Sequence, residues 1–223
     1  MKVWIRFGKK NRLKYVSHLD MQRFMHRALN RTDLPFTWSQ GFNPHPVMSF
    51  GSAMAMGWTS EYEVMEIRMN SEVDMQFVVS EMSSALPPDL PVVAARVVPD
   101  NMGAPMALTC MADYEITIDG DKAAKIIEQL PVYMAQEHVM AMRKTKSGEK
   151  EADIREMTYQ LEEAAGRPGV ICARLALTER ATLKPELLVK TLSEMAGEEP
   201  PVIHVHRTGL LSQDGVYLME LKK

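Results

Sequence analysis

Residues 2–31 read KVWIRFGKKNRLKYVSHLDMQRFMHRALNR, and the fold expected for the chain is built outward from this stretch. Its first residues alternate, with Val3 and Ile5 on one face and Trp4 on the other, which predicts a half-buried β-strand. Ser17 then stands three residues before an aspartate, a spacing typical of a helix N-cap. The rest of the stretch repeats apolar residues at helical spacing and predicts an amphipathic helix.

Further strand and helix patterns complete a unit of about a hundred residues. Alternation predicts strands at 62–69 and 92–98, a short strand is expected at 36–38, and apolar spacing predicts a helix at 74–86. The order is therefore strand, helix, strand, strand, helix, strand. This is the order of the ferredoxin-like βαββαβ unit.

A similar order of elements follows a linker at 100–105 that is rich in Asp, Asn, Gly and Pro. Helices are expected at 121–130, with Pro131 beyond the helix end, and within 151–165 after a short strand-or-helix segment. A closing strand at 202–211 would pair with 216–221 as a hairpin. We therefore predict an α+β fold of two tandem ferredoxin-like units with antiparallel sheets, in residues 1–100 and 107–223.

Composition limits the class of protein. Hydrophobic residues make up 46% of the 223 residues and charged residues 25%, as in ordinary globular domains. No apolar run has the length of a membrane helix, and no targeting segment is visible, so we expect a cytoplasmic protein without a membrane partner. The only cysteines, Cys110 and Cys172, lie far apart, which indicates a reducing compartment. No cysteine motif predicts an iron–sulfur cluster or zinc site, and no cofactor or metal is expected.

Basic residues are concentrated at the start of the chain. Residues 1–58 contain nine Lys or Arg and two acids, a net charge of +7, although the whole chain carries −3. Arg23, Arg27 and Arg31 recur every four residues on the predicted helix, so their guanidinium groups could meet successive phosphates. A solvent-facing helix side without a partner explains the same spacing, and both interpretations stay open.

A second feature is the segment 39–46, which reads SQGFNPHP. Two prolines restrict the backbone on either side of His45, and Gly41 permits angles that a side chain would forbid. The segment therefore predicts a stiff loop that presents a histidine among polar and aromatic neighbours. A simple proline-rich turn between two strands is the alternative interpretation.

Other histidines are candidates for chemistry because imidazole transfers protons near neutral pH. His18 would lie in the first turn of the predicted helix, where a structural role is favoured. His204 and His206 are two apart on a predicted strand and share a face, but no third metal ligand is evident.

These motifs resemble the radical SAM-linked domain family, a bacterial family found fused to radical SAM proteins or encoded beside them. The matching segments are 17–20 (SHLD), 39–46, 49–51 (SFG), Gly57, Ser60, Glu63, 143–155 and 206–207 (HR). The chain departs from the family pattern at Val47 and Glu156, where arginine and proline are usual. The resemblance implies a radical SAM protein as partner and, from neighbouring genes, an RNA-related substrate.

Three hypotheses follow. The first is a non-catalytic module that recognises transfer or ribosomal RNA, or an RNA–protein substrate, beside a radical SAM protein. The second is a metal-independent enzyme that cleaves or modifies RNA, with His45 and His18 as general acid and base. The third is a scaffold that docks a radical SAM partner through a methionine-rich surface. The residues expected to contact RNA or its phosphates are Lys9, Lys10, Arg12, Lys14, Arg23, Arg27, Arg31, Gln40, Phe42, Asn43, His45, Lys144, Lys146 and Arg155.

Overall fold

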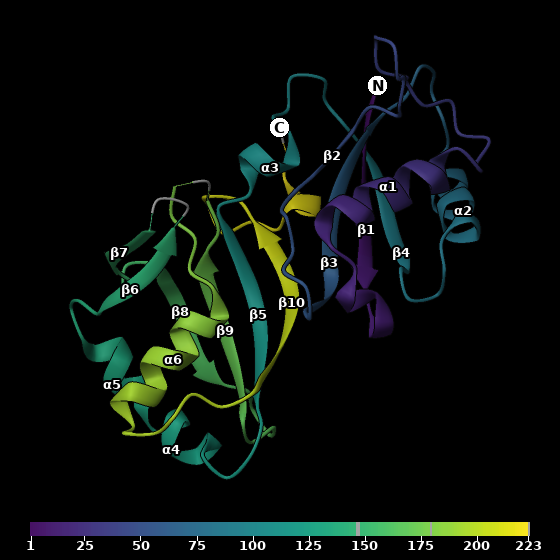
Figure 1. Cartoon of the computed structure of the whole chain (residues 1–223). Coiled ribbons are helices and arrows are strands. Elements are labelled where there is room, and N and C mark those ends of the chain that lie inside the picture. The colour runs from purple at the N-terminus through teal and green to yellow at the C-terminus, as the bar shows by residue number, and fades with distance from the viewer. Residues whose placement is uncertain (146–147, 179, 223) are drawn as a thin grey trace. The chain divides into compact units, whose positions relative to one another are not determined.

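The computed structural model describes residues 1–145, 148–178 and 180–222, which form α-helices and mostly antiparallel β-strands (Figure 1). The chain divides into two units. The first consists of Met1–Cys110 together with Gly209–Lys223, and the second consists of Met111–Thr208. The mixed α+β class that the sequence predicted is confirmed. No helix within the described ranges is both long enough and apolar enough to span a bilayer.

The first unit is built on an antiparallel sheet with the strand order β4-β1-β3, and β2 pairs with β3. Its strands are β1 (Lys2–Lys9), β2 (Met48–Phe50), β3 (Thr59–Arg68) and β4 (Val92–Val98). In register, Ile5 of β1 lies opposite Met65 of β3 on one side and Ala95 of β4 on the other. Strand β4 has the bounds that alternation predicted.

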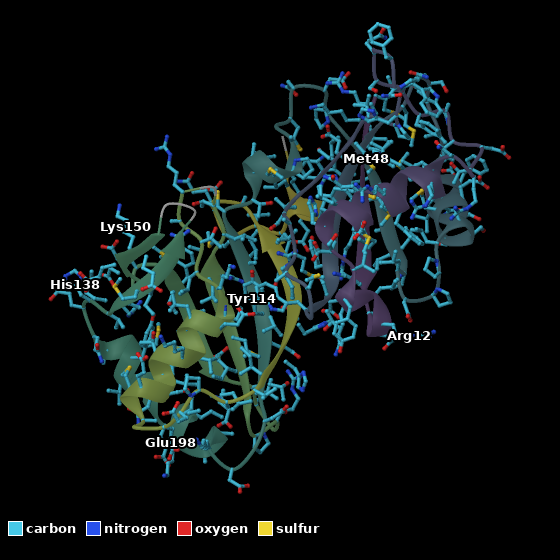
Figure 2. The ribbon with its side chains drawn as sticks, in the orientation of Figure 1. Arg12, Met48, Tyr114, His138, Lys150 and Glu198 are labelled. Atoms are coloured by element: carbon cyan, nitrogen blue, oxygen red, sulfur yellow. The ribbon has the colours of Figure 1, made fainter. Side chains whose placement is uncertain are left out.

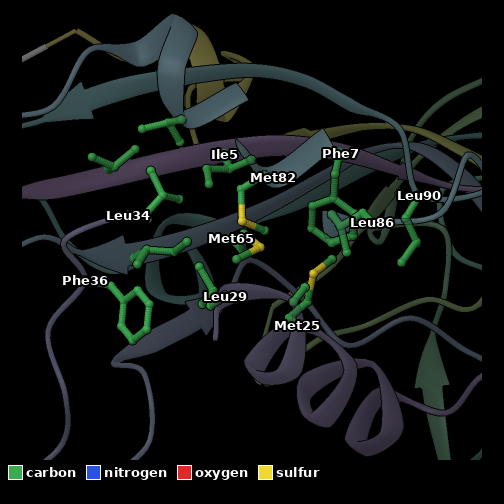
Figure 3. Close-up of a cluster of buried hydrophobic side chains, with 14 of the residues drawn as sticks. Ile5, Phe7, Met25, Leu29, Leu34, Phe36, Met65, Met82, Leu86 and Leu90 are labelled. Carbon is green, nitrogen blue, oxygen red and sulfur yellow. The ribbon is translucent and has the colours of Figure 1, made fainter. Parts of the chain in front are cut away.

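Two helices, α1 (His18–Leu29) and α2 (Met75–Ala85), cover one face of this sheet (Figure 1). Each begins at a side-chain cap, because Ser17 and Asp74 accept hydrogen bonds from backbone N–H groups of the first turn. The core between helices and sheet includes Ile5, Phe7, Met25, Leu29, Met65, Met82, Leu86 and Leu90 (Figure 3). Burial of a side chain of this size stabilises the fold by about 1.5–3 kcal/mol.

The opposite face of the sheet is covered by the end of the chain. Trp4 is fully buried there, and its indole Nε1 donates to Glu66 Oε2 at 2.9 Å. Arg96 of β4 donates to the carbonyls of Met219 and Leu221, each at 2.7 Å. Short elements accompany this cover, namely the 3₁₀ turns η1 (Asn11–Tyr15) and η2 (Leu218–Glu220) and the helix α3 (Pro105–Leu108).

This cover changes two expectations. The first strand was expected to be half-buried, whereas β1 is buried on both faces. Residues 209–223 were assigned to the second unit, but they belong to the first, where Leu210 and Leu218 are fully buried. The reason is that alternation identifies a strand without indicating which sheet face its end will cover.

In the second unit β5 lies next to β9, β9 next to β8, and β10 on the other side of β5. Its strands are β5 (Met111–Ile118), β6 (Met140–Thr145), β7 (Gly148–Asp153), β8 (Thr158–Glu163), β9 (Val170–Ala176) and β10 (Ile203–Leu211). Its helices are α4 (Ala123–Ile127), α5 (Gln129–Ala135) and α6 (Pro185–Met195). Strands β6 and β7 form a separate two-stranded hairpin.

Two helical predictions in this unit are wrong. The helix expected within 151–165 is strand β8, whose register shifts between Thr158 and Gln160. The shift leaves Thr158 and Leu161 buried three positions apart, a spacing that imitates a helix. Pro131 lies in the first turn of α5 instead of beyond a helix end, and there its missing N–H is not needed.

Candidate nucleic-acid interface

The loop at 39–46 is closed at its neck by its own backbone. The N–H of Ser39 donates to the carbonyl of His45 at 2.8 Å. Gly41 has a φ of +123°, a conformation that a side chain would strain. Phe42 is fully exposed, at 106% of its reference area. The loop is therefore held in shape while its aromatic side chain stands in solvent.

The ring of His45 is oriented by this loop. Its Nδ1 lies 3.1 Å from the backbone carbonyl of Asn43 and 3.0 Å from Ser39 Oγ, which also accepts the His45 backbone N–H. A carbonyl only accepts, so the Asn43 contact places a hydrogen on Nδ1 and leaves a lone pair on Nε2 of the neutral ring. The His45 ring lies against the ring of His26 in α1, with 5.3 Å between centroids and a tilt of 36°.

Two rows of side chains run along the solvent side of α1. The cationic row consists of Arg23, Arg27 and Arg31, all exposed. The polar row consists of His18, Gln22, His26 and Asn30, of which the first three are half-buried. Residues four apart share a helix face, so His26 belongs to a continuous polar stripe beside the arginines.

The arginines differ in their contacts. Arg23 Nη1 lies 3.1 Å from Asp20 Oδ1, in an exposed pair that solvent screens. Hydrogen bonds from Ser17 and then Arg23 lower the pKa of Asp20, so this carboxylate stays charged. Arg31 donates to the last turn of α2 at 2.7 Å and so stabilises the fold. Arg27 is exposed beside His26.

Partial burial lowers the pKa of His26, and the neighbouring His45, when charged, lowers that pKa further. The neutral ring of His26 is therefore favoured at pH 7 in the absence of an anion. A bound anion would oppose both effects, because it favours the charged form of each ring.

A small polar hollow lies at the N-terminal end of α1. Lys9 and Glu63, each 4% exposed, line it together with Ser17, His18 and Ser52. All five come from the first unit, on β1, β3, the α1 N-terminus and the segment after β2.

The contacts around this hollow indicate a structural role. Lys9 Nζ donates to the carbonyls of Val16 at 2.9 Å and Lys14 at 3.4 Å, which fixes the entry of the chain into α1. The ring of His18 meets Phe50 edge-on at 5.4 Å. The free volume is about 20 Å³, room for roughly one water molecule and too small for an organic ligand.

The remaining basic residues predicted in the first unit lie near η1. Lys10 is exposed, as is Arg12 (Figure 2), and Lys14 Nζ lies 5.2 Å from the ring of Tyr15. Lys9 differs from them because its ammonium is buried on backbone carbonyls, so it does not reach a ligand at the surface. Of the polar loop residues, Gln40 and Asn43 are exposed.

Two predicted residues of the second unit, Lys144 and Arg155, are among the described residues. Arg155 donates to the carbonyl of Met134 at 3.0 and 3.3 Å and to that of Thr158 at 3.0 Å, so its guanidinium holds the turn before β8. Lys144 lies on β6 opposite Glu149. Lys146 lies outside the described residues.

Three potential metal ligands lie within 4.8 Å of one another in this unit, on His138, Asp153 and Glu156. His138 Nδ1 is 2.7 Å from Asp153 Oδ2, while Oδ1 of the same carboxylate accepts two backbone N–H groups. These contacts, first the N–H of Val139 and then His138, lower the pKa of Asp153. The Asp153 carboxylate thus stabilises the local backbone through these N–H groups. The sequence did not predict this cluster of potential metal ligands. His204 Nε2 pairs with Asp119 at 2.9 Å.

The sequence predicted His45 as a site residue but not His26 or Gln22. The signal for these two was a row of histidine, glutamine, histidine and asparagine at a spacing of four residues, which lies beside the arginine row. The sequence also did not predict the lining of the hollow. Lys9 and Glu63 lie on β1 and β3, two strands that are distant in sequence and pair only in the folded chain.

Comparisons place the chain among known proteins. A chain in a crystal structure of a Cbf5-Nop10-Gar1 complex is similar over 98% of this chain and 53% of that chain, with a TM-score of 0.50 and 9% identity. This chain thus matches about half the length of that protein, and the likeness concerns the fold alone. A search of curated proteins gave no match. The model of a family described as uncharacterized proteins conserved in bacteria, DUF2344, matches residues 2–185, and the chain therefore belongs to that family.

Proposed function

We propose that this protein is a non-catalytic module that recognises RNA, or an RNA–protein substrate, through one surface of its first unit. This loop–helix face consists of Arg23, His26, Arg27, Gln40, Phe42, Asn43 and His45. The observation that supports it most directly is the 5.3 Å separation between the rings of His45 and His26. This contact brings the preformed loop beside the cationic row of α1.

The chemistry of the face suits single-stranded or looped RNA. Exposed guanidinium groups bind phosphate oxygens through a planar fork, and Arg23 and Arg27 are four residues apart on one helix side. The fully exposed ring of Phe42 offers a surface on which an unpaired base can stack. Gln40 and Asn43 offer amide groups to base edges. Phosphate contacts give affinity, and the loop gives selectivity.

Titration with bacterial transfer RNA at 50 and 200 mM salt tests this function. For about three phosphate contacts to unpaired RNA we expect a log–log salt slope near −2, since each contact contributes roughly −0.7. Arg27→Ala should weaken binding and make the slope shallower by about 0.7. Ribosomal RNA fragments in parallel identify the class of RNA.

The matched control is Lys190→Ala, which removes one exposed helical charge from α6 in the second unit. It should leave the salt slope unchanged. No binding to either RNA at 50 mM salt would reject the proposed function. Equal losses for Arg27→Ala and Lys190→Ala would reject the loop–helix face as its location.

A radical SAM protein as partner, in the cytoplasm, is part of the same proposal and is supported by the motif resemblance. All residues of the loop–helix face belong to the first unit, so a protein partner can bind to another surface of the chain. Co-purification with the radical SAM protein encoded nearest to this chain, with and without ribonuclease, tests the partnership. Ribonuclease-sensitive association would show that RNA bridges the two proteins.

RNA cleavage is a second candidate, favoured by the His26–His45 pair. Two adjacent rings that share one proton can supply both the base and the acid that transfer at a ribose 2′-hydroxyl needs. His18 does not join them, because it lies eight residues before His26, about 12 Å along the helix axis. RNA cleaved in the presence of a chelator, but not by His45→Ala, would favour this candidate over the binding module.

We also propose that both units are ferredoxin-like. The order β4-β1-β3 with β2 on β3, all antiparallel, supports this for the first unit. The order β10-β5-β9-β8 supports it for the second, with the β6–β7 hairpin as an insertion. An experimental structure with a different strand order in either unit would overturn the assignment.

A further inference from the structure

We propose that His26 and His45 form an oxyanion site that binds one phosphate group when both imidazole rings are protonated. The ligand class, a phosphodiester of RNA, rests on the proposed function. The site itself rests on the contact between the two rings, one from α1 and one from the loop.

The free nitrogen of His45 is already placed for this role. Its Nδ1 is held by the Asn43 carbonyl and Ser39 Oγ, while its Nε2 makes no hydrogen bond to the described residues. Protonation therefore adds a new N–H donor at Nε2 without moving the ring. A ring that is fixed before the ligand arrives loses little conformational freedom on binding, and this favours affinity.

Two adjacent imidazolium rings are unfavourable without an anion. Partial burial and the charge of His45 both lower the pKa of His26, so the pair holds fewer than two protons near neutral pH. An oxyanion beside both rings offsets the repulsion and favours the protonated form of each ring. Binding and proton uptake are therefore linked, and affinity should rise as the pH falls.

The other charges around the pair favour an anion. Arg23 and Arg27 flank His26 on α1 and supply positive charge for an anion, while the negative end of the helix dipole favours the protonated ring of His26 in the last turn. Among the nearby acids, Asp20 pairs with Arg23, and Glu81 of α2 accepts the backbone N–H of Asp33 at 2.8 Å. Arg31 and Asp33 lie in the segment that joins α1 to the loop.

NMR titration of the histidine rings tests the site with sulfate as the probe, because sulfate does not change its charge between pH 5 and 8. The intact chain is titrated in sodium chloride and in sodium sulfate of equal ionic strength, with His26→Gln and His45→Gln used to assign the signals. We expect sulfate to raise the pKa of His26 and to shift the ring signals of His45 at pH 6. His138 and His204, each beside a carboxylate, serve as internal controls. Unchanged ring signals for the pair, or equal changes in all four rings, would overturn the site.

Transfer RNA binding between pH 8 and 6 identifies the source of the phosphate. For each proton taken up, affinity should increase up to about tenfold per pH unit, and His45→Gln should flatten this dependence. His138→Gln is the matched control and should leave it unchanged. RNA binding without any sulfate effect on the pair would reject this site and leave the proposed function standing. A sulfate effect without RNA binding would support the site and reject the proposed function.

Discussion

The polar row on α1 has a histidine toward each of its ends, and the two histidines lie in different surroundings. At the first turn, the ring of His18 packs edge-on against Phe50 and contacts Gln22 at 3.2 Å, beside the buried ammonium of Lys9. Two turns later, the ring of His26 lies against the ring of His45, which belongs to a loop whose tip is open to solvent. The first end is built into the packing of the unit, whereas the second end is presented to a ligand.

This difference teaches that charge and residue type do not identify a binding surface by themselves. Lys9 and Arg27 both counted toward the net charge of +7 in the first 58 residues. One is 4% exposed and bonded to backbone carbonyls, and the other is exposed beside the loop. If the two ends are separate, substitutions at the buried end should change stability, and substitutions at the exposed end should change RNA affinity.

The largest effect is expected at the buried end. Lys9→Met should lower the free energy of unfolding by about 3 kcal/mol, because it leaves buried carbonyls without their charged donor. Urea unfolding followed by tryptophan fluorescence reports on this unit, since all three tryptophans, Trp4, Trp38 and Trp58, lie in it. Lys10→Met, the exposed neighbour, should change stability by less than about 0.5 kcal/mol.

The contrast fails if Lys9→Met folds as stably as the wild type and loses RNA binding. In that case Lys9 would belong to the ligand surface, and the buried end of α1 would not be purely structural. Equal destabilisation by Lys9→Met and Lys10→Met would also contradict the assignment.

The next effect is expected at the exposed end. Phe42→Ala should weaken RNA binding by roughly thirtyfold, which corresponds to the middle of the 1–3 kcal/mol that one stacked base contributes. Stability should not change, because the ring buries no area in the folded chain. Fluorescence anisotropy with labelled transfer RNA measures the loss. Tyr159→Ala, which removes a half-exposed ring of the second unit, is the control, and an equal loss there would contradict a role for the loop.

Local signals in the sequence predicted much of the first unit. Ser17 has the cap geometry that its spacing indicated, and β4 has its predicted bounds. These features depend on neighbours in sequence, so the pattern contains them. The stiff shape of the loop also follows from its prolines and Gly41.

What the sequence could not provide depends on partners far along the chain. The return of residues 209–223 to cover Trp4, the use of Arg155 to hold carbonyls, and the burial of Lys9 all arise from tertiary contacts. The contact of His45 with His26 is also a tertiary contact. It brings the loop and α1 together in one candidate site through a ring contact that the sequence did not indicate. A bulge in β8 produced the false helix.

A smaller effect separates the two histidine ends directly. His18→Ala should reduce stability by about 1 kcal/mol through the lost ring contact and leave RNA affinity unchanged. His45→Ala should do the reverse, with stability within about 0.5 kcal/mol of the wild type and RNA affinity reduced. Unfolding and anisotropy measured on the same preparations give both readouts. If both variants lose affinity equally, the polar row acts as one surface and the comparison breaks down.

The smallest expected effect is a pH dependence of stability that originates at His26. Its pKa in the folded chain lies below the ordinary value of 6.5, so the unfolded chain binds more protons between those two values. Stability should therefore be complete above pH 6.5 and fall as the pH drops through the lowered value. Urea unfolding at pH 5 and 7.5 should show a smaller difference for His26→Gln than for the wild type, while His204→Gln should match the wild type. Sulfate at constant ionic strength should also reduce the wild-type difference, because a bound anion restores the proton to His26. If the sulfate effect persists in His26→Gln, the anion binds elsewhere on the unit. The exposed end of α1 would then be a solvent-facing surface without a ligand.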